Sequence, residues 1–95
     1  MSYALVEDVA ASWGSYERFA AALERSVPDG LILHAAGRTE EGVRIIEVWE
    51  SEDAWHRFAT EVRAADGRFA MAQRYVRDVT PAHVVYGRPS ERTVS

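Results

Sequence analysis

The 95-residue sequence predicts a single α+β domain whose strands and helices follow the order β-α-β-β-α-β. Three observations predict this order. Short apolar or alternating runs, typical of strands, recur four times. Two stretches between them carry apolar residues at the i, i+3, i+4, i+7 spacing of an amphipathic helix. Glycine, proline and short polar segments separate these elements.

Residues 3–9 read as the first strand, with Tyr3, Leu5 and Glu7 on one face and Ala4 and Val6 on the other. Residues 12–26 follow as a helix. We expect Ser15 to be its N-cap. The apolar stripe of this helix comprises Tyr16, Phe19, Ala20 and Leu23.

A hairpin is predicted after the break at residues 26–30. Its strands are residues 31–36 and 43–50, and residues 37–42 form a polar loop bounded by glycines. The second of these strands places Val43, Ile45, Glu47 and Trp49 on one face and Arg44, Ile46 and Val48 on the other.

Ser51 is expected to cap the second helix, since Glu52 and Asp53 suit the positive end of its dipole. Its apolar stripe comprises Trp55, Phe58, Ala59 and Val62. Residues 68–76 continue this helix beyond Gly67 or form another. The fourth strand is expected at residues 82–87, with the domain spanning residues 1–87 and a polar tail at residues 88–95.

This order is that of the ferredoxin-like split βαβ arrangement, a four-stranded antiparallel sheet with both helices on one face. Both faces of the predicted hairpin are largely apolar, yet two helices can cover only one of them. An uncovered apolar face is unusual for a monomer. We therefore expect a homodimer whose sheets pack face to face.

Composition narrows the classes of function. Without cysteine, the chain forms no disulfide, thiolate zinc site or cysteine nucleophile. All 11 basic residues are arginine, scattered among 15 acidic residues, and the net charge of −4 repels phosphate backbones, so we expect no nucleic-acid partner. No signal peptide and no apolar run of roughly 20 residues are visible. A cytoplasmic protein without membrane contact is expected.

A resemblance to a known family rests on four features: the order of elements, the segment GLILHAAG, the glycine-bounded loop and, above all, the segment EVWESEDAWHRF. In these features the chain resembles the antibiotic-biosynthesis-monooxygenase-like family of dimeric α/β barrels. The resemblance covers roughly residues 3–86. Its most specific piece is the strand-to-helix step at residues 48–51. It implies a ligand pocket inside each protomer, between the sheet and the helices.

Quinone-forming members of that family oxidise tricyclic phenols with molecular oxygen and no added cofactor. The resemblance matches Trp49 to their pocket-lining tryptophan. Ile45 and Trp55 stand where they have an asparagine and a tyrosine, so Glu47 becomes the candidate polar anchor. The haem-degrading members have an asparagine, a tryptophan and an axial histidine at the positions of Glu7, Phe58 and Arg68. None of these matches, which argues against haem degradation.

His34 and Glu47 are the candidate catalytic residues. A histidine in an apolar strand suits a base, because its ordinary pKa lies near 6.5. The alternative for His34 is a buried histidine with satisfied nitrogens, and for Glu47 an ion pair with an arginine such as Arg44 of the other protomer. The candidate substrate-binding residues, each also explicable as core, are Trp49, Trp55, Phe58 and Tyr86. The three histidines, which include His56 and His83, have no metal-site spacing, so we expect no metal.

The leading hypothesis is a cofactor-free monooxygenase-like tailoring enzyme acting on an aromatic, polyketide-like molecule. In it, His34 removes a proton, Glu47 orients the substrate hydroxyl and the aromatic side chains form the walls. Two alternatives remain open: a non-catalytic dimeric barrel that binds a small apolar ligand, and a cyclase or isomerase on the same scaffold.

Overall fold

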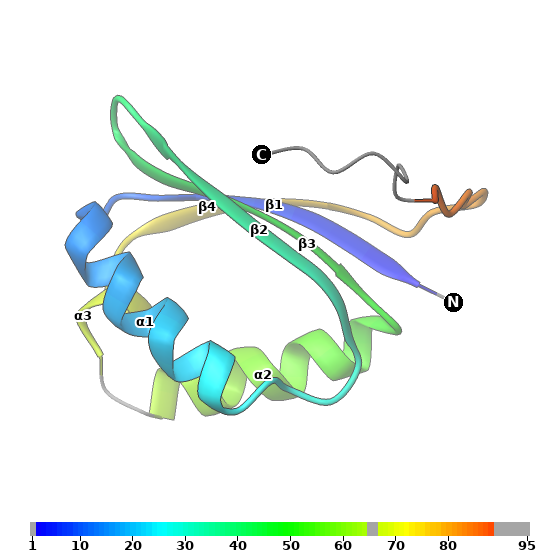
Figure 1. Ribbon diagram of the computed structural model, residues 1–95, viewed down its shortest axis with the longest axis horizontal. Coiled ribbons are helices and arrows are strands. Elements are labelled where there is room, and N and C mark those ends of the chain that lie inside the picture. The colour runs from blue at the N-terminus through cyan, green and yellow to red at the C-terminus, as the bar shows by residue number, and fades with distance from the viewer. Residues whose placement is uncertain (1, 65–66, 89–95) are drawn as a thin grey trace.

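A computed structural model describes residues 2–64 and 67–88 of the chain (Figure 1). Its elements confirm the predicted order, with one extra helical turn before the last strand. They are β1 (Tyr3–Val9), α1 (Trp13–Arg25), β2 (Leu31–Thr39), β3 (Gly42–Trp49), α2 (Glu52–Ala64), α3 (Arg68–Met71) and β4 (Arg74–Val79). No helix among these residues is long and apolar enough to cross a membrane.

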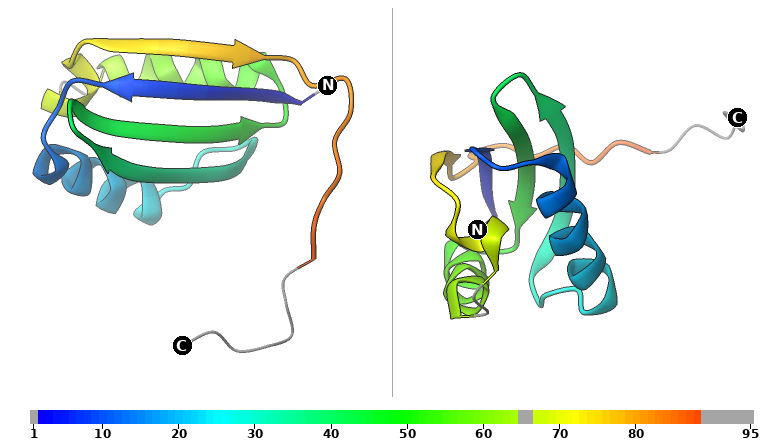
Figure 2. Two further views of the ribbon diagram at one scale, coloured as in Figure 1. Left: turned by 90° about the horizontal axis from the view of Figure 1, so that it is seen from above. Right: turned by 90° about the vertical axis from the view of Figure 1, so that its left-hand side faces the viewer.

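The strands form one antiparallel sheet in the order β2-β3-β1-β4, and α1 and α2 lie on the same side of it (Figures 1 and 2). This confirms the ferredoxin-like arrangement. The sheet is open: β2 and β4 are its two edges. Its helix-covered face is called the inner face below, and the opposite face the outer face.

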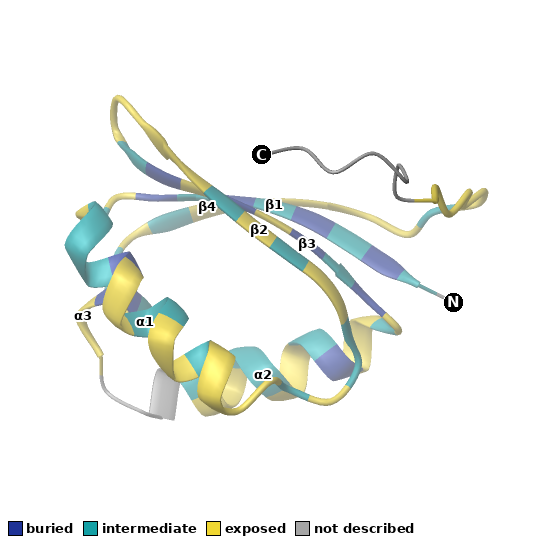
Figure 3. Cartoon of the chain, in the orientation of Figure 1, coloured by how far each residue is buried: buried dark blue, intermediate teal, exposed yellow. Residues whose placement is uncertain are grey.

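The predicted alternation of side chains between the two faces of the sheet is confirmed along β1 and along β3. Tyr3, Leu5, Glu7 and Val9 are buried on the inner face, and so are Val43, Ile45, Glu47 and Trp49 on β3 (Figure 3). The register pairs Leu5 with Glu47 and Glu7 with Ile45. Two acidic side chains of neighbouring strands therefore enter the same layer as the core.

The position of the fourth strand was wrongly predicted. It is Arg74–Val79, not residues 82–87, and the helix expected over residues 68–76 is only the short turn α3. The physical reason is that β4 is an edge strand paired with β1 alone, so its outer positions remain in solvent and accept charged residues such as Arg77. Its sequence is less apolar than that of residues 82–87, where the strand was predicted.

Residues 80–88 instead leave the end of β4 as an arm without secondary structure (Figure 2). His83 and Tyr86 lie on this arm, and the Tyr86 side chain is 73% exposed. Apart from Arg88, the predicted polar tail at residues 88–95 lies outside the described residues.

The helix caps were predicted with mixed success. Ser51 caps α2 as expected, because its Oγ accepts a hydrogen bond from the backbone N–H of Ala54 at 3.1 Å. The cap of α1 is Ser12 rather than Ser15: the N–H of Ser15 donates to Oγ of Ser12 at 3.1 Å. Ser12 and Ser15 are three residues apart, about one helical turn, and both are good N-cap residues, so the sequence alone does not distinguish them.

The hairpin between β2 and β3 is tighter than the predicted loop of residues 37–42. Gly37, Arg38 and Thr39 pair with β3, which leaves a two-residue turn. Gly42 has a φ of +150°, and a Cβ there would lie 2.2 Å from the carbonyl oxygen of Val9. Glycine is therefore required where the hairpin passes the end of β1.

Candidate functional site

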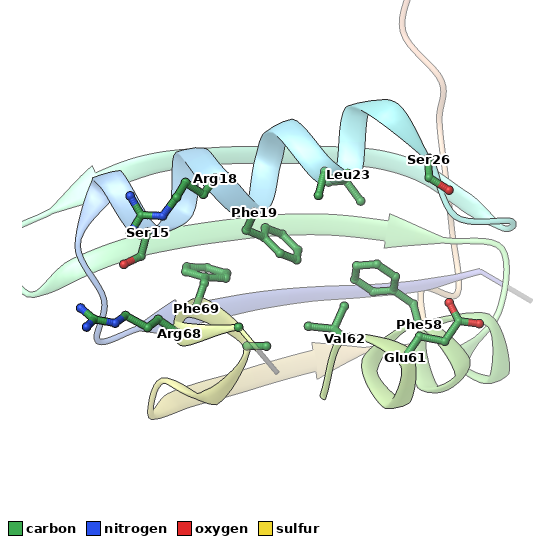
Figure 4. Close-up of a pocket in the computed structure, with 13 residues that line it drawn as sticks. Ser15, Arg18, Phe19, Leu23, Ser26, Phe58, Glu61, Val62, Arg68 and Phe69 are labelled. Carbon is green, nitrogen blue, oxygen red and sulfur yellow. The ribbon is translucent and has the colours of Figure 1, made fainter. Parts of the chain in front are cut away.

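Two adjoining cavities lie on the inner-face side of the sheet, between the helices. The cavity that touches the sheet is called the inner chamber, and the other is called the outer cleft. The outer cleft, of about 580 Å³, runs between α1 on one side and α2 and α3 on the other (Figure 4). The inner chamber, of about 280 Å³, lies against the inner face and is lined by residues of β1, β3, β4 and all three helices. Both cavities share the side chains of Phe19, Phe58, Val62, Phe69 and Ala70. A flat molecule could therefore extend from one into the other along aromatic surface.

Glu47 lines the inner chamber and is 2% exposed. The pleat of β3 turns it inward between Ile45 and Trp49. Its Oε2 lies 2.6 Å from Nδ1 of His34, and its Oε1 accepts a hydrogen bond of 3.0 Å from the indole N–H of Trp49. Since these donors occupy two of about four lone-pair positions, the carboxylate retains acceptor capacity toward the chamber.

His34 stands behind Glu47 rather than at a cavity wall, and it lines neither cavity. Its Nδ1–H donates to Glu47, and its Nε2 lies 2.7 Å from the hydroxyl of Tyr16. A neutral ring with its proton on Nδ1 accepts at Nε2, so Tyr16 is the donor in this tautomer. Burial, aided by the charge of Glu47, raises the pKa of Tyr16 and keeps its hydroxyl protonated. Both nitrogens of His34 are therefore engaged.

A second buried carboxylate, Glu7 on β1, also lines the inner chamber and is 6% exposed. Its Oε1 accepts a hydrogen bond of 3.2 Å from Arg74 on β4, and no hydrogen bond within the described part of the chain involves its Oε2. Arg74 is fixed by further bonds to the carbonyl oxygens of Phe69 and Ala72. Burial raises the pKa of Glu7 although the nearby Arg74 opposes this shift.

The predicted aromatic residues fall into three groups. Trp55 and Phe58 line the inner chamber, and Phe58 borders the outer cleft as well. Trp49 has 0% exposure and lines neither cavity. It packs against Phe58 with ring centroids 5.2 Å apart and donates to Glu47, so it supports two residues that line the inner chamber. Tyr86, on the exposed arm, belongs to neither wall.

Sequence reasoning missed Glu7, Tyr16 and Arg74 as parts of the site. The sequence did offer a reason to assign Glu7 to the site, because it is an acidic residue on the same strand face as Tyr3 and Leu5. It offered no such reason for Arg74, because the segment of Arg74 was predicted to be helical. The bond between Tyr16 and His34 depends on how α1 crosses the sheet, which residue spacing does not specify. In the described part of the chain, no three histidine or carboxylate side chains gather as metal ligands would.

No protein-family model matches the sequence, and no curated protein matches it either. Solved structures do match. A candidate antibiotic biosynthesis monooxygenase from Chloroflexus aurantiacus J-10-fl is 16% identical, with a TM-score of 0.56 over 90% of this chain and 100% of that one. A Streptomyces coelicolor monooxygenase, solved in complex with nanaomycin D, is 16% identical, with a TM-score of 0.53 over 92% of both chains.

A dimeric ferredoxin-like protein from an uncultured marine organism is 11% identical and has a TM-score of 0.51 over 90% of this chain and 92% of that one. At such low identities, these likenesses establish a shared fold and leave the chemistry to be argued from the site itself.

Proposed function

Because the chain has the antibiotic-biosynthesis-monooxygenase-like fold, we propose that it is a monooxygenase-like enzyme acting on a flat aromatic phenol. One observation carries the proposal: the inner chamber combines two buried carboxylates, Glu7 and Glu47, with walls that include Trp55, Phe58 and Phe69. Aromatic walls favour planar ligands, and buried carboxylates suit proton transfer.

The two carboxylates have different roles in this proposal. Glu47, held by His34 and Trp49, accepts a hydrogen bond from the substrate hydroxyl and orients the ring. Glu7 accepts the proton, since its Oε2 is available and its raised pKa makes it a stronger base than an exposed glutamate. His34 is thus a positioning residue. The base expected from the sequence moves from His34 to Glu7 because neither nitrogen of His34 is available.

The reaction needs only the substrate as reductant and molecular oxygen as oxidant. Removal of a proton from an anthrone-type methylene gives a delocalised anion, and oxygen adds to that carbon. The resulting peroxide takes the proton back from Glu7 and loses water to leave a carbonyl group. In sum, a CH₂ group and O₂ give a C=O group and water, so the protein supplies positioning and proton transfer.

Oxygen uptake with an anthrone-type phenol tests the proposal. We expect the wild-type protein to accelerate uptake above the spontaneous rate and to place one atom of labelled oxygen in the product. Phe58→Ala, which opens the wall shared by both cavities, should weaken this activity, whereas Val27→Ala on an exposed turn should not. Binding without oxygen uptake would favour the non-catalytic barrel. Product formed without oxygen would favour a cyclase or isomerase.

The proposal includes a homodimer formed through the outer face. This face leaves large apolar side chains in solvent, with Leu33 50%, Ile46 46% and Val79 59% exposed. At one end of the face Asp8 is already paired with Arg44 and Arg77, each at 2.7 Å. A partner sheet could therefore cover the face without burying an unpaired charge. The dimeric ferredoxin-like neighbour supports a homodimer, and the apolar outer face is the reason for placing the contact there.

Ile46→Asp should convert the dimer to a monomer, because it places a charge in the apolar part of the outer face. Val27→Asp is the matched control, since Val27 is 63% exposed but lies on the turn between α1 and β2. Light scattering after size-exclusion chromatography gives the molar mass. A monomeric wild type, or an Ile46→Asp variant that remains dimeric, would contradict the sheet-face dimer.

A further inference from the structure

The polar residues of the outer cleft are separated by charge. Arg18 and Ser15 on α1 face Arg68 of α3 at one end of the cleft, while Glu61 and Ser26 lie at the other (Figure 4). Between the two ends the walls are apolar, with Phe19 and Phe69 next to the arginines. The cleft is therefore cationic at one end and acidic at the other.

We propose that Arg18 and Arg68 bind a carboxylate group carried by the aromatic ligand. The inference rests on the proposed function, because it assigns a further chemical group to the same substrate. The rings would lie along Phe19 and Phe69, whose side chains border both cavities, and the reacting carbon would enter the inner chamber.

The chemistry of the two side chains favours this ligand group. Guanidinium groups present paired N–H donors that match the two oxygens of a carboxylate. Arg18 and Arg68 come from different helices, so an anion between them is held from both sides of the cleft. Glu61 at the opposite end repels an anion and so disfavours the reversed orientation.

The ion pairs elsewhere in the chain strengthen the argument. Arg44, Arg74 and Arg77 are each paired with a carboxylate of the sheet. Several other arginines, Arg18 and Arg68 among them, take part in no ion pair within the described residues, and of these Arg18 and Arg68 are the two that line the outer cleft. The net charge of −4 disfavours anions over the surface as a whole, so two arginines at one end of a cleft form a local exception.

Fluorescence titration with an anthracenecarboxylate and with its methyl ester tests the proposal. The two probes share the ring system and differ in charge. We expect the acid to bind more tightly than the ester. Arg18→Gln and Arg68→Gln should each weaken binding of the acid by roughly threefold to tenfold and leave the ester unchanged. Salt should weaken binding of the acid alone. Arg25→Gln is the control, because it removes the same charge from α1 outside the cleft.

The outcomes separate the two proposals. If acid and ester bind equally, or if Arg25→Gln weakens the acid as much as Arg18→Gln does, the carboxylate site is overturned while the aromatic cavity stands. If neither probe binds and anthrone-type phenols also fail to bind, both proposals are overturned. Selective loss of acid binding in the two cleft variants, together with unchanged circular dichroism, supports the carboxylate site.

Discussion

Replacing Trp49 by alanine is expected to lower the free energy of unfolding by about 3–5 kcal/mol. The indole is fully buried and packs against Phe58, so its loss removes apolar burial and leaves a cavity. The substitution also leaves Oε1 of Glu47 without its indole donor in a buried position. Since small domains are stable by only about 5–15 kcal/mol, this is a large fraction of the total.

Chemical denaturation at fixed protein concentration measures the effect, because a dimer gains stability as its concentration rises. Trp49→Phe is the matched variant: it keeps most of the aromatic packing, although a phenyl ring is smaller than an indole, and it loses the N–H donor. We expect it to cost about 1–3 kcal/mol, the penalty for one unsatisfied buried acceptor. A loss below about 1 kcal/mol for Trp49→Ala would contradict the assignment of this residue to the core and favour a wall that tolerates truncation.

The sets of side chains that share one face of a strand could be predicted because strand alternation is a local property. In β1 and β3 the side chains two residues apart share an environment, so Glu47 could be placed on the same face as Ile45 and Trp49, while the whole fold decides which face the helices cover. The same rule failed in β4, an edge strand that has Arg77 on the outer face and Asp78, the register partner of Leu5, on the inner face. A pattern of apolar residues therefore identifies strands that other elements cover, and it misses strands such as β4 that are partly exposed to solvent.

The site was harder to predict because it depends on contacts between distant segments. The bond from Tyr16 to His34 joins α1 to β2, and that from Arg74 to Glu7 joins residues 67 positions apart. Spacing along one element identifies which face a side chain occupies but not which atom it meets across the core. For this reason the sequence left open whether His34 is a base or a buried histidine with satisfied nitrogens, and the structure has the second arrangement. The helix packing that engages Nε2 is set by the whole fold.

Glu7→Gln is expected to reduce oxygen uptake by about 100-fold or more, the contribution typical of a general base. Glutamine keeps the size of the side chain, and its carbonyl oxygen can still accept from Arg74, so the wall of the chamber should persist. Glu47→Gln is a less clean test. Both partners of Glu47, His34 and Trp49, are donors, and an amide NH₂ group would face one of them without an acceptor.

The pH dependence distinguishes the two carboxylates. Glu7 must be ionised to accept a proton, and burial raises its pKa above the ordinary value of 4.5. The rate of the wild type should therefore fall as pH decreases through this raised pKa, at a higher pH than for an exposed glutamate. Glu47→Gln should retain this acid limb with a lower maximum, whereas Glu7→Gln should lose it. A wild-type rate in Glu7→Gln would remove Glu7 from the mechanism.

Unfolding measured against pH gives a readout of Glu7 that is independent of any substrate. Folding raises the pKa of this carboxyl group, so its protonation favours the folded state. This stabilisation is fully present below the pKa that the group has in the unfolded chain. It is lost as pH rises through the pKa that the group has in the folded state. Glutamine at the same position has no such dependence. The stability of the wild type relative to Glu7→Gln should therefore increase as pH falls from 7 toward 4. If the two unfolding curves stay parallel, Glu7 does not carry a raised pKa, and the physical reason for naming it as the base is lost.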